Sequence, residues 1–239
     1  MDEKYYAHWS EDGRKQTVLA HLLCTAMLCA QFAEKFGEKA LGYWAGLLHD
    51  IGKFTQAFQK RLFCGGKKVD HSTAGAWESK AYLPISLCIM GHHSGLPDLG
   101  GRTDKGKPTY FGRMNKAKSG QLEPYDAWKQ EVELPQAPKM EPKTELELDF
   151  LIRMLYSCLV DADFIDTETF MDGKAAPRGS GTDIAALRDI VSAQAQRYLR
   201  AESPSPVSVQ RNTVLRACLE KGAHGPQGLY TLTVPTGGG

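Results

Sequence analysis

Apolar residues recur at helical spacing through most of the chain. The clearest run covers residues 17–36, where Val18, Leu22 and Ala26 fall on one face and Gly37 follows as a candidate helix end. The same spacing predicts further helices at 39–49, 54–62, 72–80, 83–92, 145–164 and 183–200. The period-two alternation of strands is hard to find before residue 229. The first 200 residues therefore predict an all-α domain.

Two segments interrupt this pattern. Residues 96–143 are rich in Gly, Pro and Lys, and only 125–132 looks helical, so this segment is longer than an ordinary connection. We expect it to be functional or partly disordered. Residues 201–207 have the composition of a linker, after which 210–221 predicts a helix and 229–234 a strand. The organisation predicted is one main domain at 1–202 and the start of another at 203–239.

Composition narrows the class of protein. With 239 residues, 42% of them hydrophobic, the chain can bury one sizeable core. Its net charge of +1 gives no global attraction for nucleic acid, so an acidic partner would need a local patch. Six cysteines without a CxxC pair favour a reducing cytoplasm over disulfides or a zinc ribbon. No apolar run approaches the roughly 20 residues of a membrane span, so we expect a soluble cytoplasmic protein.

Five of the seven histidines lie in the first hundred residues, on or at the ends of predicted helices: His21, His49, His71, His92 and His93. Asp50 follows His49 directly. Imidazole and carboxylate groups together suit Mn²⁺, Fe²⁺, Co²⁺, Ni²⁺ or Zn²⁺. A single histidine such as His21 is more typical of a hydrogen-bonded core residue. The whole set indicates a metal site, because burying five imidazoles and a carboxylate costs free energy unless something coordinates them.

Helix ends would let adjacent residues share one metal ion. Consecutive helical residues point roughly 100° apart, so His49 and Asp50, or His92 and His93, converge only where a helix stops. The sequences that predict these stops are Ile51-Gly52 and Ser94-Gly95. The histidines outside the pattern, expected on the surface, are His8 and His224.

The predicted helix at 145–164 offers an acidic ligand from the far side of the core. With Leu155 as the centre of its apolar stripe, Asp163 falls near the edge of the stripe and Asp161 near the opposite side. We therefore expect Asp163 as the ligand, with Asp161 as the alternative. Lys53 could hold a scissile phosphate or the charge of its transition state, although a lone lysine is more typical of solvated surface.

Several motifs together resemble the HD phosphohydrolase superfamily, a helical fold. They are Gly46-Leu-Leu-His49-Asp50-Ile-Gly52-Lys53, the upstream His21, Gly91-His92-His93-Ser94-Gly95 and the late Ala162-Asp163. The double histidine and the intervening His71-Ser72 are similar to the HD nuclease domain of the CRISPR-associated helicase-nuclease of type I systems. The run from Leu159 to Glu168 looks closest to subtype I-C.

The resemblance implies two ligand sets joined by Asp50. One holds His21, His49, Asp50 and the late aspartate, and the other holds Asp50, His71, His92 and His93. The implied cofactors are two divalent ions, Mn, Ni, Co or Fe, with Mg as a further option. We expect Asp50 and Lys53 to be the catalytic residues of a DNA endonuclease.

The implied substrate is single-stranded DNA, and the implied partners are an RNA-guided CRISPR surveillance complex and the helicase domain of a longer chain. Two alternatives stay open. One is a phosphohydrolase acting on nucleotides or cyclic oligonucleotides, because the HD fold hosts that chemistry too. The other is a non-catalytic docking module.

The last residues resemble the start of a superfamily 2 helicase. A predicted strand at 229–234 runs into Pro235-Thr-Gly-Gly-Gly239, which looks like a phosphate-binding loop. A working loop needs the Lys and Ser/Thr that follow the last glycine, and neither is present. We therefore expect an incomplete ATP site and a truncated helicase domain; a flexible tail is the alternative.

A basic stretch, residues 102–118, lies in the loop that begins just after His93. The stretch contains six cationic residues and one acidic residue, Asp104. Tyr110 and Phe111 lie between the cationic residues. Such a segment would suit a single-stranded DNA path, where bases stack on rings. A solvated loop or protein-docking surface is an equal alternative. The cations are Arg102, Lys105, Lys107, Arg113, Lys116 and Lys118.

Overall fold

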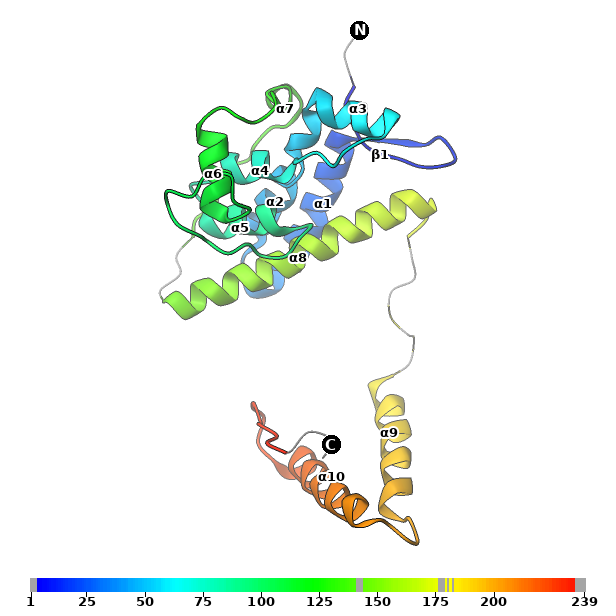
Figure 1. The fold of residues 1–239 in the computed structure, drawn as a ribbon. Helices are drawn as coiled ribbons and strands as arrows, with labels where there is room; N and C mark the ends of the chain where they lie inside the picture. The colour runs from blue at the N-terminus through cyan, green and yellow to red at the C-terminus, as the bar shows by residue number, and fades with distance from the viewer. Residues whose placement is uncertain (1–3, 141–143, 176–178, 180, 182, 235–239) are drawn as a thin grey trace. The chain divides into compact units, whose positions relative to one another are not determined.

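A computed structural model describes residues 4–140, 144–175, 179, 181 and 183–234 (Figure 1). The chain divides into two compact units, Met1–Ala176 and Pro177–Gly239. The boundary between these units precedes the domain boundary expected at residue 202, which stays a prediction. All the candidate metal ligands belong to the first unit.

Four helices build the core of the first unit: α1 (Val18–Ala33), α2 (Lys39–Leu48), α5 (Leu83–Gly91) and α8 (Glu145–Asp172). Helix α8 crosses α1, α2 and α5 (Figure 1). Every residue of α5 from Pro84 onwards is buried. A helix that is apolar on all sides must lie inside the domain, so α5 carries its C-terminal residues into the interior.

The ends of these helices follow local rules. Thr17 caps α1 by accepting from the Ala20 amide at 3.2 Å, and Thr144 forms a capping box with Glu147 at the start of α8. After α1, the short 3₁₀ helix η1 (Glu34–Phe36) ends at Gly37 with a φ of +86°, the helix end that the sequence predicts. These caps fix the helices that carry the candidate site.

Shorter helices connect α2 to α5. Helix η2 (Ile51–Phe54) is separated from the end of α2 by two residues and leads into α3 (Gln56–Cys64), while α4 (Ser72–Glu78) begins after a short irregular segment. Helix α4 packs on both η2 and α5. The packing of these elements places residues 49–53, 71 and 92 close together, without a contribution from α8.

The described residues are mostly helical, as the sequence predicts, and the exception is a short hairpin near the N-terminus. Strands β1 (Tyr6–Trp9) and β2 (Lys15–Thr17) form an antiparallel hairpin. Strands of this length show no clear alternation in the sequence. Gln59 of α3 fixes the hairpin by accepting from the Tyr6 amide and donating to the Tyr6 carbonyl, both at 3.0 Å.

The segment 96–143 also holds more helix than expected. Helix α6 (Tyr110–Lys118) was not predicted, whereas α7 (Trp128–Glu131) falls inside the predicted 125–132. The buried residues Tyr110, Met114 and Ala117 recur at spacings of four and three. This helical pattern is short, and the Gly, Pro and Lys residues around it give the segment the composition of a loop. The sequence therefore did not predict a helix here.

The second unit contains α9 (Ile184–Leu199) and α10 (Pro206–His224), close to the helices predicted at 183–200 and 210–221. The strand expected at 229–234 is absent from the described residues. A strand needs a neighbour to accept its hydrogen bonds, and the described part of this unit offers none. The phosphate-loop residues 235–239 lie outside the described residues.

Candidate metal centre

The candidate ligands that are adjacent in sequence lie at the ends of helices. His49 is the C-cap of α2 and keeps helical φ and ψ, whereas Asp50, the N-cap of η2, leaves the helical region with a φ of −121° and a ψ of 20°, so their side chains can converge. His92 is likewise the C-cap of α5, with His93 after it. His71 stands immediately before α4. Each pair therefore lies at the kind of helix end that the sequence predicts.

The structure brings the predicted ligands together in two groups. In each group the ligand atoms lie within 4.8 Å of one another. The first group is His21, His49, Asp50 and Asp163, and the second is Asp50, His71, His92 and His93. Only His93 is exposed, so the two groups form a buried cluster with one open edge. Each group could hold a metal ion.

Asp50 belongs to both groups and offers one oxygen to each. Its Oδ2 lies 3.3 Å from His21 Nε2 and 3.4 Å from His49 Nε2. Its Oδ1 lies 3.3 Å from His92 Nε2 and 3.4 Å from His71 Nε2. This is the arrangement of a carboxylate that can bridge two cations.

Two buried polar atoms in the centre support the fit of a cation. Asp50 Oδ1 and His92 Nε2 make no hydrogen bond to any described group. Leaving such atoms buried and unsatisfied costs free energy. A divalent ion bound between them would satisfy both, so the residues present fit a metal.

Hydrogen bonds at the outer nitrogens fix the histidine tautomers. His49 Nδ1 lies 2.7 Å from the Gly46 carbonyl, His92 Nδ1 2.7 Å from the Ile89 carbonyl, and His71 Nδ1 3.0 Å from the Val69 carbonyl. A carbonyl only accepts, so each Nδ1 carries the hydrogen. Each Nε2 therefore turns its lone pair to the centre, as metal-binding histidines require.

The late aspartate that reaches the cluster is Asp163. Its Oδ1 lies 3.3 Å from His21 Nε2 and 3.6 Å from His49 Nε2, and the residue is 7% exposed. Asp161 is exposed on the other side of α8. The phase of the apolar stripe in the sequence therefore predicts which of the two aspartates faces the cluster. The role of Asp163 as a metal ligand stays a prediction.

Asp166 also contacts the cluster, and the sequence pattern did not predict this. Its Oδ2 accepts from His21 Nδ1 at 2.6 Å and from Gln16 Nε2 at 2.9 Å. Helix α8 continues to Asp172 rather than ending at the predicted 164, and Asp166 stands one turn after Asp163 on the same face. That spacing of three was the available signal. Asp166 orients His21 in the way that a carboxylate supports a metal-binding histidine.

His8 is not the plain surface residue that we expected. It lies on β1, and its ring centroid is 4.7 Å from that of His21. Its Nε2 is 3.4 Å from Lys53 Nζ. Partial burial, Lys53 and His21 lower its pKa to about 3, so this imidazole is neutral. His224, at the end of α10, is exposed as expected.

Lys53 is buried against the carboxylate of Asp50, which both ligand groups share. Its Nζ lies 2.6 Å from Asp50 Oδ2, and the residue is only 4% exposed. An ammonium group can donate three hydrogen bonds. Lys53 is therefore tied to Asp50 rather than solvated, and it also lines a pocket that opens beside His71 and His93.

The electrostatics of the first ligand group favour positive charge at His21. Burial and Lys53 lower the pKa of His21, but hydrogen bonds to Asp163, Asp166 and Asp50 outweigh them and raise it to about 10. Burial raises the pKa of Asp50, yet Lys53 and the nearby histidines hold it well below its usual range. The carboxylates are ionised, and their combined charge attracts a cation.

Glycines let these segments approach closely. A Cβ at Gly52 would lie 2.1 Å from the His71 carbonyl oxygen, and one at Gly75 would lie 2.0 Å from the Leu48 oxygen. The sequence predicts a helix stop at Ile51-Gly52. The φ of Gly52 is not positive, and the role of this glycine is to let the His71 segment pack against η2.

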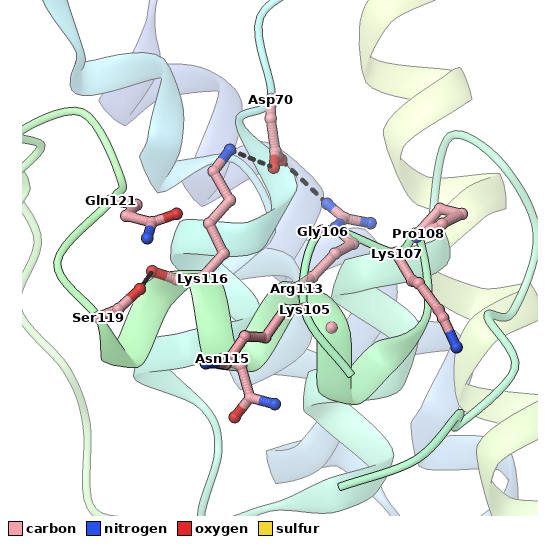
Figure 2. Close-up of a pocket in the computed structure, with 11 residues that line it drawn as sticks. Asp70, Lys105, Gly106, Lys107, Pro108, Arg113, Asn115, Lys116, Ser119 and Gln121 are labelled. Carbon is pink, nitrogen blue, oxygen red and sulfur yellow. Dashed lines mark hydrogen bonds and ion pairs between the residues drawn. The ribbon is translucent and has the colours of Figure 1, made fainter. Parts of the chain in front are cut away.

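The basic stretch is only partly free to bind DNA. Arg113 donates to Asp70 Oδ1 at 2.9 Å, to Ser72 Oγ at 2.7 Å and to Thr73 Oγ1 at 2.8 Å, and also to the Met90 carbonyl at 2.9 Å. These bonds join the start of α4 to the end of α5. Figure 2 shows Arg113 and Lys116 both directed at Asp70. Arg113 is therefore a structural residue.

Stacking on Tyr110 is also excluded. Tyr110 is 5% exposed, and its hydroxyl lies 3.1 Å from Ser86 Oγ, so its ring packs in the core. Phe111 is half-buried. The remaining cations of the stretch are exposed: Arg102, Lys105, Lys107, Lys116 and Lys118.

A helical domain with a buried His and Asp cluster around one shared carboxylate defines a candidate divalent-metal centre. Residues 18–116 match the family model of the HD domain, so an HD domain is present in this part of the chain. HD domains are generally metal-dependent hydrolases, and the cluster fits that chemistry. The matched range contains every predicted ligand except Asp163.

Comparison with curated proteins gave no match to the chain. Among the described residues, no helix has both the length and the apolar character needed to cross a membrane. All six cysteines are free.

Proposed function

We propose that this protein is a metal-dependent endonuclease that cleaves single-stranded DNA in CRISPR interference. The observation that carries the proposal is Asp50, whose two oxygens face two separate ligand groups. Two ions held side by side suit the cleavage of a phosphodiester. The resemblance of the His-Asp, His-Ser and His-His motifs to the nuclease domain of type I helicase-nucleases supports the choice of substrate.

Bound divalent ions would supply Lewis acidity, which activates water and stabilises the oxygens that enter and leave phosphorus. The chain provides the rest of the site. Asp50 positions both ligand groups, and Asp166 holds His21 in its tautomer. Lys53 reaches the pocket beside His71 and can donate to a phosphate oxygen while it stays paired with Asp50.

The proposal includes partners. The exposed cations of the basic stretch, Arg102, Lys105, Lys107, Lys116 and Lys118, would contact the DNA backbone. A helicase domain on the same longer chain would deliver the strand, after an RNA-guided surveillance complex has opened the target. Support for these partners comes from the sequence resemblance alone.

Cleavage of circular single-stranded DNA tests the proposal. The chain is stripped of metal and supplied with Mn²⁺, Ni²⁺, Co²⁺, Mg²⁺ or Zn²⁺, beside an Asp50→Ala variant. Circular DNA has no ends, so nicking demonstrates an endonuclease. We expect metal-dependent nicking that the variant lacks.

The same experiment separates the alternatives. Protein that binds metal but leaves the DNA intact contradicts the nuclease proposal. Release of product from mononucleotides or cyclic oligonucleotides by that protein would favour a nucleotide phosphohydrolase. Inactivity on all of these substrates would favour a docking module.

A further inference from the structure

A cationic pocket opens beside the second ligand group. Its lining includes Lys53, Arg61 and Lys68 together with the ligands His71 and His93. Among the described residues that line it there is no carboxylate. Its volume of about 390 Å³ lies at the lower end of the range for small-ligand pockets, roughly 300–1,000 Å³, which leaves room for about one nucleotide.

Two of these cations are free to bind a ligand. Among the described residues, no hydrogen bond, ion pair or ring contact engages the side chain of Arg61 or Lys68. Arg61 is half-buried on α3, so part of its side chain is already removed from water and its backbone is held in a helix. Lys68 is exposed on the segment that leads to His71.

The pocket of Figure 2 provides a contrast. There Arg113 and Lys116 pair with Asp70, and Lys107 pairs with Asp104 at 3.0 Å. Three of the four cations that line this pocket therefore have an acidic partner within the protein, and the fourth is Lys105. In the pocket beside the metal ligands, Arg61 and Lys68 have no such partner, so an anion from outside would meet two uncompensated charges.

We propose that Arg61 and Lys68 bind a backbone phosphate next to the scissile one, and that the substrate is therefore a nucleic-acid strand rather than a simple phosphate ester. The inference rests on the proposed phosphodiesterase function. Lys53 and the ligand groups would receive the scissile phosphate. A diester cut from a strand carries a second phosphate one nucleotide away, and the two free cations lie beside the ligand groups where it would bind.

The test compares the full chain with an Arg61→Gln/Lys68→Gln double variant. The matched control is Lys60→Gln/Lys67→Gln, which removes two exposed charges that are adjacent in sequence but do not line the pocket. The Kd of a fluorescein-labelled oligothymidylate is measured by anisotropy across sodium chloride concentrations, with chelator present. Each backbone contact contributes about 0.7 to the slope of log Kd against log salt for single strands.

We expect the double variant to lose about 1.4 from that slope, which is a roughly seven-fold smaller change in Kd between 50 and 200 mM salt. The control keeps the wild-type slope. An Arg61→Lys variant, which preserves the charge, also keeps it, and this separates electrostatic binding from a change in folding. A double variant with the wild-type slope overturns the inference.

Kinetics on two diesters complete the test. With Mn²⁺ present, kcat/KM of the double variant should fall further on the oligonucleotide than on bis(p-nitrophenyl) phosphate, which has no neighbouring phosphate. Equal losses on both overturn the inference. If the wild-type chain hydrolyses neither diester, the proposed function itself fails, whatever the binding data show.

Discussion

Gly52→Ala tests how closely the second ligand group depends on backbone packing. The new Cβ would lie 2.1 Å from the His71 carbonyl oxygen and 2.6 Å from His71 Cα. The two segments must therefore separate by about 1 Å before they reach van der Waals contact. Overpacking of this kind costs about 1–3 kcal/mol in the free energy of unfolding.

The displacement acts on the metal site directly. His71 Nε2 now lies 3.4 Å from Asp50 Oδ1, and a metal tolerates errors of only about 0.2 Å in its ligand distances. We expect the variant to bind metal at the second group at least about 10-fold more weakly. The first group, which does not use His71, should keep its affinity.

Two measurements check this prediction. Thermal unfolding of the metal-free chain should show a Tm about 2–12 °C lower than wild type, at about 2–4 °C per kcal/mol for a unit of this size. Calorimetric titration with Mn²⁺ should show one strong and one weakened site. The control is Gly222→Ala in α10, where a Cβ meets no atom within 4 Å. Wild-type Tm and two unchanged sites in Gly52→Ala would refute the reasoning.

Three further predictions concern individual ligands and their supports. Asp163→Asn should abolish tight metal binding at the first group, while Asp161→Asn, which alters an exposed carboxylate on the same helix, should titrate like wild type; equal effects would contradict the assignment. Asp166→Asn should weaken metal binding at the first group by about 10–100-fold, because His21 loses a charged acceptor at 2.6 Å, and an unchanged calorimetric Kd would count against this role. Arg113→Met should loosen the packing of α4 on α5 and lower the metal affinity of the second group more than that of the first, and Arg113→Lys should restore part of the loss. Equal weakening of metal binding at both groups would contradict this prediction.

The positions of the candidate ligands could be predicted because their signals are local. His49-Asp50 and His92-His93 stand where apolar helices stop, and the phase of one helix distinguishes Asp163 from Asp161. Each inference needs only a short stretch of sequence and the geometry of a helix.

The supporting residues could not be predicted in the same way. His8 reaches the site on a hairpin whose strands are too short to show alternation. Arg113 looked like a DNA-binding cation because its partner Asp70 lies 43 residues earlier in the chain. Gly52 looked like a helix stop, and only the packed structure reveals its contact with the His71 backbone. These roles depend on long-range contacts, which composition and periodicity do not encode.

The central claim is that Asp50 joins two metal ions in one centre. Electron paramagnetic resonance of the chain loaded with Mn²⁺ tests it most directly, together with the metal content per chain. The account predicts two Mn²⁺ per chain with an exchange-coupled spectrum, and loss of that coupling in Asp50→Asn. One ion per chain, or two ions that give only the six-line signal of isolated Mn²⁺, would contradict it.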